Sequence, residues 1–377
     1  MSGAKFERAS VVSGLGISRV ARRSGRSDID HTTEAVLAAV ADAGLSVRDI
    51  DGIATIGDLA ADALQDALGL RPKWISENVA KIQLSAFFNA CLAVAAGLCR
   101  HVLVYRSVQM MGGTLLGNPA SAKAVGWGEW LLPFRAYSAA NWVALHARRH
   151  MHEYGTTAEQ LGWVALNSRR HAALNELAAF RDPLTMDDYL ASRWVSEPLR
   201  LLDCDVPVDG AVAFVVSSAD YARDAPNPAI RVEAIGSALE GRPSWHLRED
   251  FPAMAAHDAA RHLWSRTDLK PADVDVAEIY DGFTFLTLAW LEALGFCGRG
   301  ESGPFVEDGA RIGLGGELPL NTYGGQLSAG RLHGYWLLHE ACLQLRGEAG
   351  ARQVAGAEVA LAAAGGGPIG GCVLLTR

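Results

Sequence analysis

The stretch YGTTAEQLGWVALNSRRHAALNELAAFRDPLTMDDYLASRWVSEPLRLLDCDVPVDGAVAFVV, which spans Tyr154–Val216, contains the clearest structural signals in the chain. Thr157 followed by Gln160 is typical of a helix N-terminus, because each side chain can satisfy a backbone N–H group of the other residue. The small and β-branched residues of Asp205–Ser218 predict a strand long enough to lie in the centre of a sheet. A helix followed by a buried strand indicates an α/β protein.

The same alternation continues on both sides of this stretch. Apolar residues at helical spacing predict the helices Asp28–Ala43, Gln83–Leu98, Asn141–Tyr154, Thr157–Leu174, Ala253–Ser265, Phe285–Leu294 and Gly334–Leu345. Short apolar runs predict the strands Gly52–Ile56, His101–Tyr105, Ile230–Gly236, Val276–Tyr280, Val359–Ala364 and Gly371–Thr376. Because the order of elements in the first half recurs in the second, we predict an α/β layered protein with a weak internal duplication.

The chain has 377 residues, which is long for one ordinary single-core domain. The best boundary is DAPNP, Asp224–Pro228, because it combines proline, asparagine and aspartate. We therefore predict an N-terminal half of residues 1–222 and a C-terminal half of residues 228–377. Met110–Ala140 is rich in glycine and aromatic residues, and it predicts an inserted segment of loops and helices over about residues 110–200.

The composition excludes several classes of function. The net charge is -8 and the sequence has no basic stripe, so nucleic acid is not an expected partner. The 6 cysteines form no CxxC pair, which favours reduced thiols in a cytoplasmic protein. The sequence shows neither a signal peptide nor a membrane-spanning apolar run. His146 and His150 have the spacing of a metal pair but lack a third ligand, so we expect a solvated helix face and no metal site.

Four segments together resemble the thiolase superfamily, in particular its sterol-carrier-protein and lipid-transfer-protein branch. They are Tyr154–Val216, VDVAEIYDGFTFLTLAWLEALGFCGRGESGPFVEDG, LPLNTYGGQLSAGRLHG and AAAGGGPIGG. The last three stand at the places of the family's Glu-(Ile/Val)-(Asn/His)-(Glu/Asp)-x-Phe, Asn-x-x-Gly-Gly-x-x-x-x-Gly-His-Pro-x-Gly and Cys-x-Gly-Gly-Gly motifs. The resemblance covers nearly the whole chain. It implies the thiolase fold, an α/β fold in which two similar αβαβα halves form a five-layered body.

The sequence departs from the thiolases at the residues that carry their chemistry. The position of the acyl-bearing cysteine falls at or next to Ala80, and that of the second, acid–base cysteine at about Ala363. Arg331 replaces the histidine of Gly-His-Pro, and Tyr280 replaces the asparagine or histidine of the middle motif. Covalent acyl transfer requires an activated nucleophile with a base in reach. We therefore expect chemistry without an acyl-cysteine intermediate.

The remaining polar groups define a candidate site in the cavity between the halves. Tyr280 and Asp281 end a strand, and a nearby cation favours the ionised form of a phenol. Tyr280 is thus the candidate base, with Asp281 beside it and with Arg331 or protonated His333 as the cation. Backbone N–H groups in glycine turns can hold a thioester or enolate oxygen. The candidate substrate- and oxyanion-binding residues are Tyr323, Gly324, Gly325, Gly365, Gly366 and Gly367.

A retro-aldol cleavage fits these groups, because it needs a base and enolate-stabilising donors but no cysteine. Tyr280–Phe283 and Arg331–Gly334 look like the thiolase-like aldolases that cleave steroid-type side chains of acyl-CoA substrates to a ketone and a short acyl-CoA. This resemblance implies Tyr280 as base. Some of those aldolases have a second tyrosine near the position of Arg331, and we expect His333 to replace it. The resemblance also implies a coenzyme A thioester as substrate, no cofactor, a homodimer, and a small OB-fold zinc-ribbon partner in a heterotetramer.

Alternative interpretations stay open at this point. The chain could instead be a thiolase-like acyltransferase that uses another residue, or a non-catalytic subunit that binds lipid or acyl-CoA. In the structural alternatives, Tyr280 only packs at a strand end, Asp281 caps the following helix, and Arg331 pairs with an acidic neighbour at a subunit interface. Asp203–Asp205 is interpreted as a structural turn that leads into the central strand.

Overall fold

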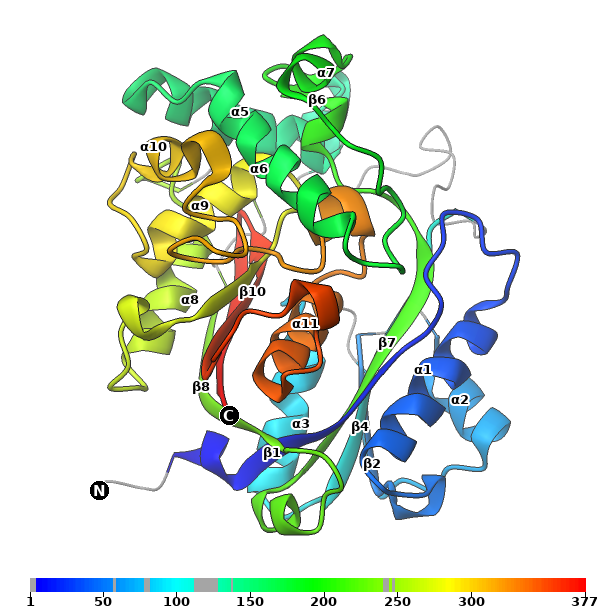
Figure 1. Ribbon diagram of the computed structural model, residues 1–377. Helices are drawn as coiled ribbons and strands as arrows, with labels where there is room; N and C mark the ends of the chain where they lie inside the picture. Colours follow the sequence, from blue (N-terminus) through cyan, green and yellow to red (C-terminus); the bar gives the residue numbers. More distant parts are fainter. Residues whose placement is uncertain are drawn as a thin grey trace.

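The computed structural model describes residues 5–56, 59–77, 82–111, 128–136, 138–239, 244–245 and 248–377. The body of the molecule consists of five layers, in the order helix, sheet, helix, sheet, helix (Figure 1). This is the layered α/β architecture that the sequence predicts. Within the described ranges, no helix combines the length and the apolar content that a membrane crossing requires.

The strands follow one continuous order, β3-β2-β4-β7-β1-β8-β11-β10-β9, in which a short antiparallel pairing of β1 with β8 joins two sheets. The first sheet, β3-β2-β4-β7-β1, is built by the N-terminal half. Its strands are β1 (Ser10–Ile17), β2 (Gly52–Thr55), β3 (Trp74–Glu77), β4 (His101–Gln109) and β7 (Asp209–Ser218), and its outer helices are α1 (Asp28–Asp42) and α2 (Ala61–Leu68). Helix α1 can lie against β1 because Gly14 and Gly16 have no side chain. A Cβ atom at Gly14 would be 2.1 Å from the carbonyl oxygen of Ala39 in α1.

The second sheet repeats the plan of the first. Its order is β8-β11-β10-β9, and its strands are β8 (Ile230–Leu239), β9 (Val276–Ile279), β10 (Val359–Gly366) and β11 (Ile369–Thr376). Counted from β1 in the first sheet and from β8 in the second, the first two pairings are antiparallel and the next is parallel. The outer helices are α8 (Ala255–Trp264) and α9 (Thr284–Leu294). The shared order and sense of the strands confirm the duplication of elements that the sequence indicates only weakly.

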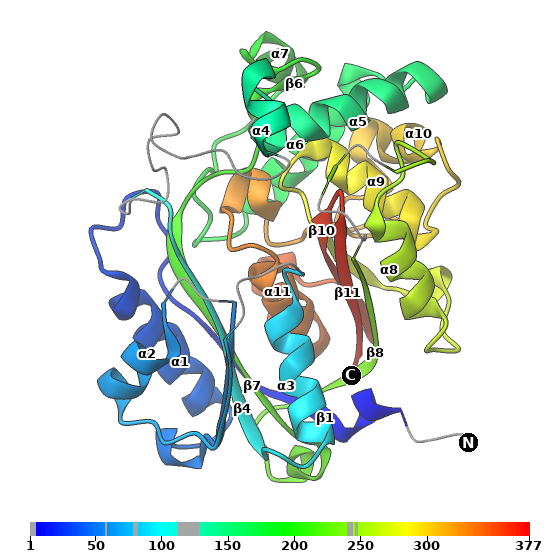
Figure 2. The same cartoon turned by 180° about the vertical axis from the view of Figure 1, so that it is seen from behind.

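Two helices fill the layer between the sheets, as Figures 1 and 2 show. They are α3 (Ser85–Ala95) and α11 (Tyr335–Arg346). Almost every residue of α11 is buried, which is expected of a helix with sheets on both sides. Even Arg346, at the end of α11, is buried and forms an ion pair of 2.6 Å with Asp42. The two halves therefore share one continuous core.

A helical lobe lies over one end of the layers (Figure 2). It contains α4 (Gly128–Leu131), α5 (Ala139–Tyr154), α6 (Ala158–Ala172), α7 (Met186–Ala191), β5 (Trp194–Ser196), β6 (Leu199–Arg200) and α10 (Ser302–Val306). Helix α6 begins as predicted, because Thr157 Oγ1 accepts the N–H of Gln160 at 3.2 Å. Most of this lobe comes from the segment predicted as an insertion between β4 and β7.

One strand boundary differs from the prediction in a way that bears on function. Strand β7 begins at Asp209, whereas the sequence predicts a strand from Asp205. The N–H groups of Asp205 and Val206 are bonded outside the sheet, to the carbonyl oxygens of Gly282 at 3.1 Å and Gln326 at 2.8 Å. These residues therefore belong to the candidate site rather than to the central strand.

Candidate active site

Strand β9 carries Tyr280 and Asp281 at its end, beside β10. Ile279 pairs with Ala363 in the parallel ladder, and the N–H of Tyr280 donates to the carbonyl oxygen of Ala363 at 2.8 Å. The residue predicted at the place of the second cysteine therefore lies against the backbone of the candidate base, and it carries no thiol. Ala80, predicted at the place of the acyl-bearing cysteine, lies outside the described residues.

Asp281 is fully buried and holds the π-helical turn Gly325–Ala329. Its Oδ1 atom accepts the N–H of Gln326 at 2.8 Å, and its Oδ2 atom accepts the N–H of Leu327 at 3.4 Å. Gly325 is required here, because a Cβ atom would be 2.0 Å from Oδ2 of Asp281. The N-cap of α9 is Phe283, so the alternative in which Asp281 caps the following helix is wrong. Burial raises the pKa of Asp281 to about 6.

A short extended segment, Asp205–Val206, connects the end of β9 with the loop after the π-helical turn. The N–H of Asp205 donates to Gly282, and the carbonyl oxygen of Val206 accepts the N–H of Arg331 at 2.9 Å. These backbone bonds bring the segment that carries Asp205 next to Gly282 and Arg331. Asp205 was not predicted as a site residue, because the sequence pattern alone indicates a turn.

Arg331 forms an ion pair of 3.1 Å with Asp205 of the same chain, so the predicted acidic neighbour is present. Its place at a subunit interface stays a prediction. Its Nε and Nη2 atoms also donate to Sδ of Met110, at 3.3 and 3.2 Å. Sulfur is a weak acceptor, so Asp205 is the main anionic partner of this guanidinium. Burial raises the pKa of Asp205 to about 6, although the charge of Arg331 opposes the increase.

Tyr280 is buried, with 7% of its surface exposed. Burial, followed by the negative charge of Asp205, raises the pKa of Tyr280 to about 12, while Arg331 and Gln83 act in the opposite direction. The expectation that Arg331 poises a phenolate is therefore wrong, because Arg331 is paired and burial outweighs its effect. Gly282 allows the ring to take its place, since a Cβ atom there would be 2.5 Å from the ring of Tyr280.

His333 follows Arg331 in a left-handed conformation, with φ of 50°. Burial, together with the positive charges of Arg106 and Arg331, holds the pKa of His333 well below its usual range. The imidazole is therefore neutral at physiological pH. His333 can exchange a hydrogen bond or a proton, but the expectation that it supplies a positive charge beside Tyr280 is wrong.

The remaining predicted residues lie in two turns. The ring of Tyr323 is fully buried against Trp336, at 5.0 Å between ring centroids, and its hydroxyl has no hydrogen-bond partner among the described residues. Gly324 and Gly325 have positive φ angles and lead into the π-helical turn.

The triple glycine begins inside a strand rather than in a turn, because β10 extends through Gly366. The carbonyl oxygen of Gly365 accepts from Trp290, and the N–H of Gly367 donates to Sδ of Met254 at 3.2 Å. The ring of Trp245 covers Gly366 and Gly367. The oxyanion-binding role of these glycines stays a prediction.

Known proteins share both this fold and the length of the chain. Residues 238–373 match the family model described as thiolase C-terminal domain-like. The chain is 37% identical to a steroid side-chain-cleaving aldolase of Thermomonospora curvata, over 90% of each protein. It is 38% identical to the 17-hydroxy-3-oxo-4-pregnene-20-carboxyl-CoA lyase of Mycobacterium tuberculosis, over 96% of this chain and 97% of the relative. This chain belongs to the thiolase superfamily.

Within that superfamily, the chain belongs to the sterol-carrier-protein branch that includes the thiolase-like aldolases. A solved structure described as an Ltp2-ChsH2(DUF35) aldolase superimposes with a TM-score of 0.91, at 35% sequence identity over 99% of each chain. The similarity extends over both halves of the molecule and includes the segments that build the site.

This thiolase-superfamily chain has no activated thiol. Burial raises the pKa of all six cysteines, and none of them forms a disulfide. Cys204 lies next to the site residue Asp205, and burial, with the charges of Asp203 and Asp205, raises its pKa to about 12. A nucleophilic cysteine needs the opposite environment, one that lowers its pKa.

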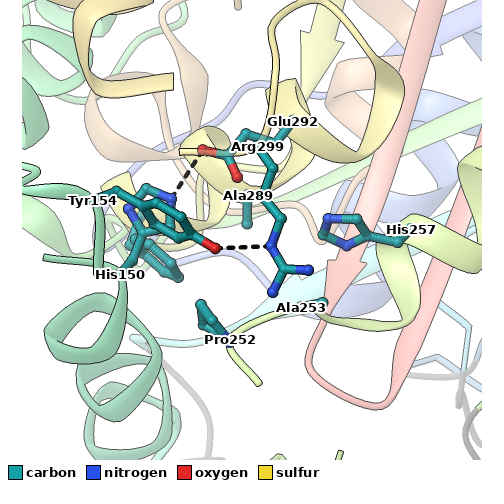
Figure 3. Close-up of a pocket in the computed structure, with 9 residues that line it drawn as sticks. His150, Tyr154, Pro252, Ala253, His257, Ala289, Glu292 and Arg299 are labelled. Atoms are coloured by element: carbon teal, nitrogen blue, oxygen red, sulfur yellow. Dashed lines mark hydrogen bonds and ion pairs between the residues drawn. The ribbon is translucent and has the colours of Figure 1, made fainter. Parts of the chain in front are cut away.

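A small pocket lies where α5 of the helical lobe faces α8 and α9 (Figure 3). His150 is 2% exposed, and it bonds to Glu292 at 2.9 Å and to Thr156 at 2.8 Å. His146 is also buried, against the loop that contains Pro252. The predicted solvated face is therefore wrong, because α5 packs this face against elements from the other half. Across the ranges that the structure describes, no cluster of three or more His, Cys, Asp or Glu residues could hold a metal.

Proposed function

We propose that this protein is a carbon–carbon lyase that cleaves a β-hydroxyacyl-CoA with a bulky, steroid-type substituent into a ketone and a short acyl-CoA. The observation that carries the proposal is the cluster of Tyr280, Asp205 and Arg331 beside Ala363. A tyrosine thus lies beside the position where a thiolase has its second cysteine. The names of the relatives from Thermomonospora curvata and Mycobacterium tuberculosis support the same reaction and the same class of substrate.

The reaction transfers one proton out and one proton back. A base removes the proton of the β-hydroxyl, the C–O bond becomes a carbonyl, and the bond between the α and β carbons breaks. The electron pair of that bond forms a thioester enolate, which is protonated at the α carbon. Tyr280 is our candidate for the group that contacts the hydroxyl, and general acid–base catalysis of this kind contributes about 10²–10⁴-fold. His333 and the glycine turns are our candidates for stabilising the enolate oxygen.

The acyltransferase alternative needs a covalent acyl-enzyme. The high pKa values of the cysteines and the alanine at position 363 argue against it. Incubation with a labelled acyl-CoA tests this point directly. A label that stays on the denatured protein would favour the acyltransferase, whereas tight acyl-CoA binding without turnover would favour a non-catalytic subunit.

The proposed lyase activity can be tested with the purified chain and its small partner. Steroid-type β-hydroxyacyl-CoA thioesters are added, and the ketone and the short acyl-CoA are measured by mass spectrometry. We expect both products in equal amounts, and their loss in the Tyr280→Phe variant. The proposal would be falsified if no thioester were cleaved, or if Tyr280→Phe behaved as the wild type.

We also propose that the chain forms a homodimer through β3 and joins a small OB-fold zinc-ribbon protein in a heterotetramer. Strand β3 lies at the end of the sheet order, and Ile75 at its centre is 44% exposed. An exposed edge strand is a template for pairing with a second chain. The description of the matched structure as an Ltp2-ChsH2(DUF35) aldolase supports a second component. Six unpaired cysteines support a cytoplasmic location.

Light scattering tests the dimer, with Ile75→Lys as the variant. A lysine at this position places a charge at the centre of the proposed strand pairing, and we expect a monomer. Leu98→Lys is the control, because Leu98 is also exposed, at 56%, but lies outside β3. If the Ile75→Lys variant is still a dimer, β3 is excluded as the interface. The same conclusion follows if Leu98→Lys dissociates the dimer to the same extent.

A further inference from the structure

A cleft lies where β1 of the first sheet pairs with β8 of the second, at the end of the layers opposite the helical lobe (Figure 1). Its volume of about 540 Å³ is within the range of small-molecule sites, about 300–1,000 Å³. Three arginines, Arg8, Arg223 and Arg231, line it. We propose that this cleft binds a small molecule through a diphosphate or a longer phosphate chain.

Arg231 lies in the floor of the cleft, and the sheet fixes its position. In the ladder it is opposite Val11 of β1 on one side and Thr376 of β11 on the other. Directly opposite residues of neighbouring strands place their side chains on the same face of a sheet. All three residues line the cleft. The backbone of Arg231 is therefore held by two neighbouring strands, which a loop residue would not have.

The other two arginines come from short helical turns beside this floor. Arg8 belongs to η1 (Phe6–Ala9), which packs against β8. Arg223 belongs to η6 (Ala219–Arg223), which packs against β1. The fold thus brings three arginines to one cleft from a segment before β1, a segment after β7 and the start of β8. No local sequence pattern connects them.

The charges that line the cleft are not balanced. Arg223 and Arg231 have no ion pair or side-chain hydrogen bond with any other residue that the structure describes. Among the described lining residues, Glu233 is the one carboxylate. Lys5 binds it at 2.8 Å, and Arg8 is 3.8 Å from it. Four cationic side chains therefore share one carboxylate, in a chain whose net charge is -8.

Two further carboxylates are close in sequence but do not line the cleft. Asp220 pairs with Arg100 at 3.5 Å, and Asp224 is exposed beyond the end of η6. Neither therefore neutralises the arginines of the cleft. A cleft concentrates the field of like charges along its walls and raises the local concentration of ions of opposite charge. Binding of an anion would relieve the repulsion between Arg223 and Arg231.

The use of arginine favours a phosphate chain over a single carboxylate. A guanidinium binds carboxylate or phosphate through two parallel N–H···O bonds. One carboxylate can satisfy one guanidinium in this way, whereas a phosphate chain offers oxygens to several guanidiniums at once. The described lining includes no aromatic ring on which a base could stack. The site therefore recognises the phosphate chain itself, which inorganic pyrophosphate and a nucleotide share.

The cleft is separate from the candidate active site. Ala363, which lies beside Tyr280, pairs with Cys372 of β11. Thr376 lies about 13 Å further along this strand, at about 3.3 Å for each residue. A phosphate chain bound at Thr376 is therefore out of contact with Tyr280. The inference does not depend on the proposed lyase function, and the Tyr280→Phe variant should bind phosphate chains as the wild type does.

Isothermal titration calorimetry of the full chain tests the site, with inorganic pyrophosphate as the probe. Low ionic strength is used, because salt screens exposed charges. We expect one site for each chain and binding about 10-fold weaker in the Arg223→Gln/Arg231→Gln double variant. Arg48→Gln is the matched control, because Arg48 is an exposed arginine of a short helical turn outside the cleft. Absence of pyrophosphate binding, or equal weakening in Arg48→Gln, would overturn the proposal.

Three further titrations define the ligand. Citrate carries a charge similar to that of pyrophosphate, and it should bind more weakly because its oxygens belong to carboxylates. Equal affinity for citrate would overturn the assignment to phosphate. ADP should compete with pyrophosphate, and the tighter of the two identifies the source as a nucleotide or as an inorganic phosphate chain. Arg231→Lys should bind pyrophosphate with intermediate affinity, because lysine keeps the charge but loses the planar fork.

Thermal unfolding provides a readout that is independent of heat. A ligand that binds the folded state raises Tm by mass action. Pyrophosphate should therefore raise the Tm of the wild type and of Tyr280→Phe, and it should have a smaller effect on the Arg223→Gln/Arg231→Gln variant. Without ligand, the double variant should be at least as stable as the wild type, because two like charges are removed. An equal shift of Tm in the wild type and the double variant would show that pyrophosphate binds elsewhere.

Discussion

Two carboxylate–arginine clusters lie near β9, and they differ in how the arginine pairs with the carboxylate. In the core cluster, Glu340 binds Arg352 through both oxygens at 3.0 Å, and Thr322 connects Glu340 to Glu278. In the site cluster, Asp205 has one contact of 3.1 Å with Arg331, which is 25% exposed. Both clusters are buried for much of their surface, so burial alone does not distinguish a catalytic carboxylate from a structural one.

The difference lies in what each carboxylate can still bind. Glu340 is fully buried and saturated by a bidentate arginine, so it holds α11 to the segment that contains Arg352. Burial and the charge of Glu340 hold the pKa of Glu278 well above its usual range, which favours the protonated form of this residue. Asp205 has a single contact with Arg331, and its charge acts on Tyr280. Oε2 of Glu278, in the core cluster, also has no hydrogen-bond partner among the described residues. The two clusters are therefore distinguished by how an arginine pairs with the carboxylate, bidentate at Glu340 and through one nitrogen at Asp205.

The largest effect on kcat is expected when the hydroxyl group of Tyr280 is removed from the site cluster. Tyr280→Phe should reduce kcat about 10²–10⁴-fold, because the phenol is the group that we propose to contact the substrate. The free energy of unfolding should change by less than about 1 kcal/mol. Tyr221→Phe is the matched control, since its hydroxyl only donates to Ala43, far from the site. An equal loss of activity in both variants would mean that the assay reports folding rather than chemistry.

In the core cluster, a substitution should lower the stability of the protein and leave kcat nearly unchanged. Glu340→Ala leaves Arg352 without its bidentate partner, and breaking such a buried pair costs about 3–5 kcal/mol. We expect a value near the lower limit, because Arg352 is 14% exposed. Urea unfolding measures this loss, and kcat per folded molecule should stay near the wild-type value. A strong loss of kcat without a loss of stability would remove the distinction between the two clusters.

A smaller effect is expected at the glycine that joins the site to the π-helical turn. Gly325→Ala places a Cβ atom 2.0 Å from Asp281 and also strains a residue with φ of 59°. Gly69→Ala is a matched control, because Gly69 has φ of 67° and no heavy atom near the added Cβ. The left-handed conformation alone costs about 1–2 kcal/mol. Gly325→Ala should cost more than Gly69→Ala in unfolding experiments and should also lower kcat, and equal costs would contradict the role of this contact.

Local sequence patterns were sufficient for most of the fold and for part of the site. Tyr280 and Asp281 could be predicted, because they lie where the apolar run of a predicted strand ends and a predicted helix follows. Asp205 could not be predicted, since its role depends on Arg331, which is 126 positions later in the chain. Backbone hydrogen bonds, such as the one from the N–H of Arg331 to the carbonyl oxygen of Val206, bring the two residues together.

The errors have the same physical origin. His146 and His150 lie on a helix face that the sequence predicts to be solvated, yet that face contacts Pro252 and Glu292 from the other half. The neutral state of His333 likewise depends on burial and on Arg106, which no local pattern reveals. The prediction was therefore limited by contacts between distant segments of the chain. It was not limited by the assignment of helices and strands.

The smallest effect is predicted for a third carboxylate, that of Glu292, which is paired with His150. Burial raises the pKa of Glu292, but hydrogen bonds from His150 and Ser302 outweigh it, so the net pKa lies below the usual value. A lowered pKa contributes stability that is present above the unfolded-state pKa, about 4.3, and is lost as the pH falls through the folded-state pKa. Wild-type protein should therefore lose more unfolding free energy than Glu292→Gln on acidification below about pH 4, by about 1.4 kcal/mol for each unit of pKa difference. Parallel pH curves for the two proteins would contradict this pairing. Activity at neutral pH should be equal in both, because this carboxylate lies in α9 beside the pocket of Figure 3, where His150 and Ser302 bind its Oε1 atom, and is not one of the candidate site residues.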